Sequence, residues 1–77
     1  MISKGKLKKE LKYTLLKFFK QKNKFFSMNN TKGWDSLNHL RLMMLLQKKF
    51  AVDLNNKEIA KLTDEKKIYF VISKKIK

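Results

Sequence analysis

The sequence contains no cysteine, no proline and only one histidine among its 77 residues. Without cysteine the chain can form neither a disulfide nor a cysteine-based zinc site, and His39 alone cannot hold a metal ion. No metal site is therefore predicted. The absence of proline and the presence of only two glycines favour an all-helical protein, because both residue types interrupt helices. A chain of this length is expected to form a single domain, 1–77, stabilised by helix packing.

Acidic residues are also scarce, with six against 20 lysines and arginines, which gives a net charge of +14. Such an excess attracts polyanions, whether nucleic acid, anionic membranes or acidic protein surfaces. Arg41 is the one arginine, although arginine is the usual residue for forked recognition of phosphates and bases. The coding preference of an AT-rich genome is therefore an equally open explanation of the lysine excess. No paired carboxylates or nucleophile–base spacing are present, so no catalytic residues are predicted.

Long hydrophobic runs are missing as well. The longest apolar run, Leu42 to Leu46, falls far short of the roughly 20 residues that a membrane span needs. The lysine-rich N-terminus is not followed by the uninterrupted apolar segment of an export signal. The expectation is a cytoplasmic, monomeric protein without a membrane span.

The apolar residues that are present predict a small four-helix bundle with three longer helices and a short third one. A long connection is expected at 23–35, with Trp34 either anchoring it to the core or contacting a partner; the anchor is favoured. His39 is expected at the surface or against this loop. The helices are expected at 3–22, at 36–49, at 56–62 and from the cap Thr63 onward.

The second of these helices carries more apolar surface than one face needs, which predicts a central position. Leu37, Leu40 and Met44 are expected to form its main buried stripe, and Arg41 and Lys48 its polar face. The residues expected to extend the buried stripe are Leu42, Met43, Leu46 and Phe50.

The stretch Gly33-Trp34-Asp35-Ser36-Leu37 begins this helix. Aspartate and serine are preferred helix caps, and a helix N-terminus favours a negative group, so Ser36 could carry a phosphate ester there. The simpler interpretation is that Asp35-Ser36 is only a cap.

The order of elements, the near-central serine and the motif together resemble the acyl carrier protein family, over residues 3–76 and most closely over 33–72. Gly33, Asp35, Ser36 and Leu37 match the attachment motif of that family. The other matching positions are Leu42, Leu46 and Phe50 in the second helix and Glu58, Ile59, Lys61, Leu62 and Thr63 in the third-helix region.

The resemblance implies a carrier rather than an enzyme. A phosphopantetheinyl transferase would esterify Ser36 with 4'-phosphopantetheine from coenzyme A, and Asp35 would help that transferase position its metal ion and coenzyme A. The arm would supply the thiol that this chain lacks and hold acyl or aminoacyl groups as thioesters, as carriers do in fatty acid biosynthesis. A bound chain would shelter among Leu46, Ile59 and Leu62, although plain core packing is the simpler interpretation of these three residues.

The charge departs from the family, because typical fatty-acid carriers present carboxylates on their second helix. Here Arg41 and Lys48 occupy that region, which indicates partners with acidic or apolar docking surfaces and, with Trp34, a specialised carrier. The main alternative is a small basic helical protein that binds nucleic acid. A third possibility is a membrane-surface or interaction module that uses the amphipathic segment 3–22.

Overall fold

The first helix, α1 (Lys4–Phe19), begins and ends where local groups satisfy its free backbone atoms. In the computed structural model, which describes residues 3–76, the Ser3 side chain accepts a hydrogen bond from the Lys6 amide at 3.2 Å. Lys20 takes the left-handed conformation, with φ of 56°, and its N–H donates to the Leu16 carbonyl. The expected end near residue 22 is therefore wrong, because a left-handed residue terminates a helix.

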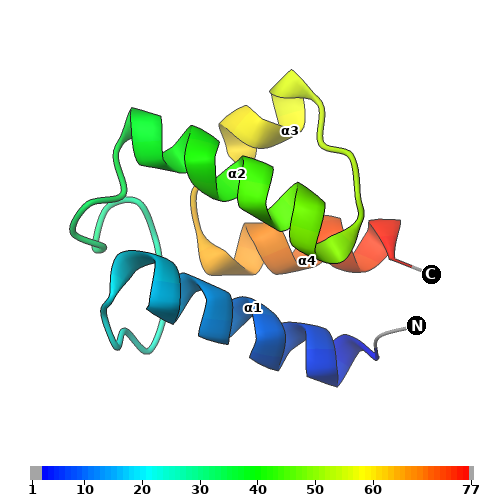
Figure 1. Ribbon diagram of the computed structural model, residues 1–77, viewed down its shortest axis with the longest axis horizontal. Coiled ribbons are helices and arrows are strands. Elements are labelled where there is room, and N and C mark those ends of the chain that lie inside the picture. The colour runs from blue at the N-terminus through cyan, green and yellow to red at the C-terminus, as the bar shows by residue number, and fades with distance from the viewer. Residues whose placement is uncertain (1–2, 77) are drawn as a thin grey trace.

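Three more helices complete the described part of the chain: α2 (Ser36–Phe50), α3 (Asn56–Lys61) and α4 (Glu65–Lys75). Figure 1 shows α1 and α4 side by side, with α2 next to them and the short α3 beside α2. The prediction of a small all-α bundle with three longer helices and a short third one is confirmed.

The core draws side chains from the three longer helices and from the connections between them. Each helix contributes residues at intervals of three or four, which places them on one face. The buried apolar side chains are Leu7, Leu11, Leu15, Phe26, Trp34, Leu42, Met43, Leu46, Val52, Leu54, Leu62, Ile68 and Ile72.

Helix α2 is turned differently from the expected orientation. Leu37, Leu40 and Met44, expected to form the main buried stripe, are 59%, 53% and 70% exposed. The core instead receives the face that carries Leu42, Met43 and Leu46, together with His39. Both faces of α2 are apolar, so helical spacing identifies two stripes without telling which one packs inward.

The caps of the last two helices follow from short polar side chains. Asn55 and Glu58 form a capping box at the start of α3, each side chain accepting from the other residue's backbone N–H. The cap of α4 is Asp64 rather than Thr63, because the Asp64 carboxylate accepts from the Lys67 amide at 2.7 Å. The Thr63 carbonyl instead accepts from the Met28 amide of the long connection, at 2.8 Å.

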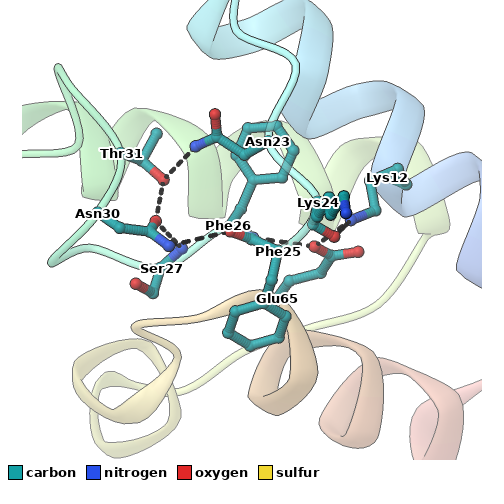
Figure 2. Close-up of polar contacts among 9 residues, drawn as sticks. All are labelled: Lys12, Asn23, Lys24, Phe25, Phe26, Ser27, Asn30, Thr31 and Glu65. Carbon is teal, nitrogen blue, oxygen red and sulfur yellow. Dashed lines mark hydrogen bonds and ion pairs between the residues drawn. The ribbon is translucent and has the colours of Figure 1, made fainter.

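The connection between α1 and α2 is fastened to α4, as Figure 2 shows. Phe26 is fully buried, its amide donates to a Glu65 carboxylate oxygen at 3.1 Å, and its carbonyl accepts from the Glu65 amide at 2.7 Å. Lys12 of α1 donates to the same carboxylate at 2.8 Å. Asn30 closes the loop on itself by accepting from the Ser27 amide and donating to the Phe25 carbonyl. The long connection is therefore packed over the core.

Candidate functional site

The predicted attachment motif forms a tight turn followed directly by α2. Gly33 has φ of +88°, a conformation that residues with a Cβ rarely adopt, and the Trp34 amide donates to the Thr31 carbonyl at 3.2 Å. Asp35 is the N-cap of α2, and its carboxylate accepts from the Asn38 amide at 2.9 Å. The Asn38 side chain donates to the Gly33 carbonyl at 2.8 Å, which joins the turn to the helix.

Ser36 is the first residue of α2 and lies exposed to solvent. At this position it is surrounded by the partial positive charge of the helix N-terminus. A small surface hollow beside the turn is lined partly by Lys32, Gly33, Asn38 and Arg41, so two cations lie on this side of the motif. The arrangement gives a solvent-facing hydroxyl on a rigid element, in a field that favours an attached phosphate.

Trp34 holds the motif against the rest of the bundle. Its indole is only 4% exposed and stacks on Phe19 of α1, with ring centroids 5.0 Å apart. The interpretation as a loop anchor is therefore correct, and the burial of the ring leaves Trp34 little surface to offer a partner.

His39 is buried as well, and it links α2 to α3. Its Nδ1 accepts from Trp34 Nε1 at 3.0 Å, so the ring proton lies on Nε2, which donates to the Ile59 carbonyl oxygen at 2.6 Å. The prediction of a loop contact is right, since Trp34 belongs to the loop, but a surface position is wrong. Spacings of three, four and seven residues to Leu42, Met43 and Leu46 place His39 on their face of the helix, although the sequence does not show that this face packs inward.

The outer face of α2 extends away from Ser36 along the helix. Leu37, Leu40 and Met44 are more than half exposed, and Arg41 and Lys48 lie exposed among them at helical spacing. The structure thus brings Leu37 and both cations to the surface that carries Ser36. Contiguous exposed apolar side chains of this kind mark surfaces that contact other molecules.

The three residues of the expected acyl-chain pocket pack as core. Leu46 is fully buried and Leu62 is 1% exposed, while Ile59 is partly buried against the same cluster. The hydrogen bond from His39 to the Ile59 carbonyl ties α3 to α2 in this region.

Comparison with known proteins finds no matching family model, no matching curated protein and no matching solved structure. Among the residues that the structure describes, no helix has the length and apolar character required to cross a membrane. Histidine and acidic side chains in the same range form no group of three or more that could hold a metal ion.

Proposed function

We propose that this chain is a carrier protein of the acyl-carrier type, which holds acyl or aminoacyl groups as thioesters on a 4'-phosphopantetheine arm attached to Ser36. The observation that carries the proposal is the exposed Ser36 hydroxyl at the first position of α2, directly after the N-cap Asp35 and the positive-φ turn at Gly33. The order of three longer helices and a short third helix supports the same assignment.

Attachment would join the Ser36 oxygen to the phosphate of 4'-phosphopantetheine, while the nucleotide part of coenzyme A leaves. A separate phosphopantetheinyl transferase performs this step in the carrier family. The amides of the first turn of α2 that lack a partner would stabilise the resulting phosphodiester charge. The terminal thiol of the arm supplies the thioester chemistry that a chain without cysteine cannot provide.

The carrier itself performs no catalysis; it raises the local concentration of a tethered intermediate at the active sites of its partners. Leu37, Leu40 and Met44, with Arg41 and Lys48 among them, form the docking surface next to Ser36. Partners with acidic and apolar surfaces match this patch, whereas partners with basic patches are repelled. Enzymes that use acidic fatty-acid carriers are therefore expected to load this chain less efficiently than their own carrier.

The test is the intact mass of the protein before and after incubation with coenzyme A and a broad-specificity phosphopantetheinyl transferase. We expect the parent chain to gain one phosphopantetheine and the Ser36→Ala variant to gain none. Ser3→Ala is the matched control, since Ser3 is also exposed at the start of a helix; this variant should be modified like the parent. No gain on the folded parent with several transferases would refute the proposal.

A further inference from the structure

A groove of about 580 Å³ lies between α1 and α4, at the end closed by the α1–α2 loop. Its apolar lining residues are Leu11, Phe25, Tyr69 and Phe70. The volume lies in the range of small-molecule pockets, roughly 300 to 1,000 Å³. None of the residues from Gly33 to Leu37 lines this groove, so it is separate from the proposed attachment site.

The groove is also strongly basic. Lys8, Lys24 and Lys66 line it, and none of the three has a carboxylate within 4.0 Å among residues 3–76. The one carboxylate in the lining belongs to Glu65, which is 7% exposed and already accepts from Lys12 Nζ and from the Phe26 amide. The groove therefore combines several lysines that form no ion pair in the described residues with apolar side chains.

Two aromatic rings of the groove are partly open to solvent, and the Lys74 ammonium lies over the Phe70 ring, 4.1 Å from its centroid. Phe25 is 44% exposed and Phe70 is 58% exposed. Covering these rings with an apolar body would remove a large hydrophobic area from water, which favours binding. A ligand of this groove therefore needs an apolar body to cover the aromatic rings and a negative group to contact the lysines.

We infer that this groove binds a small amphipathic anion of the alkyl carboxylate class, with its carboxylate among Lys8, Lys24 and Lys66 and its chain over Tyr69 and Phe70. A stable protein partner would need about 800 Å² of surface on each side, much more than this groove offers. Duplex nucleic acid is bound through its phosphates and offers no apolar body to cover Phe25 and Phe70, whereas a single strand can stack its bases on such rings and is therefore one arm of the test below. The inference does not depend on modification of Ser36.

The experiment is a titration of the full chain followed through its backbone amide resonances, with octanoate as the probe, kept below the concentration at which it forms micelles. Saturable shifts are expected for groove residues. Acetate has the same head without the chain, and octyltrimethylammonium has the same chain with the opposite charge. Neither should saturate the groove in the same range.

Two variants test the groove directly, and each has a matched control on α2. Lys66→Glu should weaken octanoate binding about threefold or more, and Phe70→Ala about fivefold. Lys48→Glu and Leu40→Ala make the same chemical changes at exposed positions outside the groove and should change binding less than about twofold. All four positions are exposed, so the variants are expected to fold, which circular dichroism verifies.

Several results would overturn the inference. Equal shifts with acetate, or equal weakening by Lys48→Glu, would mean a general charge effect. Equal binding of octyltrimethylammonium would mean an apolar site without charge selection. Binding only to anionic phospholipid vesicles would indicate a membrane surface, and groove shifts caused by an oligothymidylate but not by octanoate would indicate nucleic acid. Ser36→Ala should bind octanoate like the parent, which separates this test from that of the carrier function.

Discussion

His39 links three parts of the molecule through two hydrogen bonds of a single ring. Its Nδ1 accepts from the buried Trp34 indole, and its Nε2 donates to the Ile59 carbonyl. A buried polar group that loses its partner costs about 1–3 kcal/mol. The turn before Ser36 is therefore tied through Trp34 to a histidine two residues beyond the motif.

We expect His39→Ala to lower the free energy of unfolding by about 2 kcal/mol or more, because it strands the Trp34 N–H and leaves a cavity. Trp34 is the one tryptophan of the chain, so its fluorescence in a urea titration reports the change directly. Leu40→Ala, one position further along α2 and 53% exposed, should stay within about 0.5 kcal/mol of the parent. Equal losses in both variants would show that the hydrogen bonds do not matter.

At this scale the sequence predicts where α2 begins, but it does not predict which contacts hold the preceding turn in place. Cap preferences are local, so Asp35 and Ser36 can be placed at the start of a helix from their neighbours alone. The burial of His39 depends on Trp34 and on the Ile59 carbonyl, 20 residues away. A polar side chain without a visible partner in the sequence looks like a surface residue until the fold supplies that partner.

Among the elements, Glu65 fastens the long loop and α1 to the start of α4. Its carboxylate receives Lys12 and the Phe26 amide, while its own amide donates to the Phe26 carbonyl. We expect Glu65→Gln to destabilise the fold by about 1 to 2 kcal/mol, since hydrogen bonds to a charged group are stronger than neutral ones and Lys12 is one-third exposed.

The matched control for this prediction is Glu10→Gln, which makes the same change of charge. Glu10 lies 3.8 Å from Lys49, and both side chains are more than one-third exposed, so the loss should stay below about 0.5 kcal/mol. Urea denaturation of the two variants under the same conditions gives the comparison. A loss for Glu10→Gln that equals the loss for Glu65→Gln would contradict the role of Glu65.

Glu58 connects α3 to α4 and makes that connection dependent on pH. The hydrogen bond from the Asn55 backbone N–H, and then the contact with Lys75 at 3.1 Å, lower the pKa of the Glu58 carboxyl below its ordinary value of 4.5. A carboxyl group whose pKa is lower in the folded state stabilises the fold at pH values above its ordinary pKa. This contribution is lost as the pH falls through the lowered pKa.

We therefore expect Glu58→Gln to lower stability at neutral pH and to flatten the loss of stability that the parent shows below about pH 5. Thermal unfolding followed by circular dichroism across the acidic range measures both effects. Lys75→Gln removes only the second cause and should flatten the profile partly. An unchanged acid profile in Glu58→Gln would mean that other carboxylates govern this pH range.

The sequence predicts the number and order of the elements, whereas their ends and orientations come from tertiary contacts. The capping box at Asn55 is visible in the sequence because both partners lie within one turn. Thr63 and Asp64 are both acceptable caps by residue type, and only the structure shows that the Asp64 carboxylate accepts from the Lys67 amide at the start of α4. The inward face of α2 is likewise decided by the helices it meets rather than by its own pattern.

At the scale of the whole molecule, the excess of positive charge lowers the stability of the folded state. The net charge of +14 is carried by a body with extents of 32 × 26 × 17 Å, so most lysines lie within reach of several others. Only four ion pairs form among residues 3–76. Mutual repulsion of the remaining cations destabilises the compact state, in which they are held closer together than in the unfolded chain.

We expect added salt to stabilise this protein, since the Debye length falls from about 30 Å at 0.01 M to about 8 Å at 0.15 M ionic strength. The midpoint of thermal unfolding should rise by about 5 °C over that range, which corresponds to roughly 1 kcal/mol for a domain of this size. Circular dichroism at matched protein concentration measures the shift.

A triple variant, Lys9→Gln, Lys32→Gln and Lys57→Gln, neutralises exposed lysines that form no ion pair in the described residues. This variant should unfold at a higher temperature than the parent in low salt and respond less to added salt. A parent midpoint that falls with salt would show that attractive pairs outweigh the repulsion.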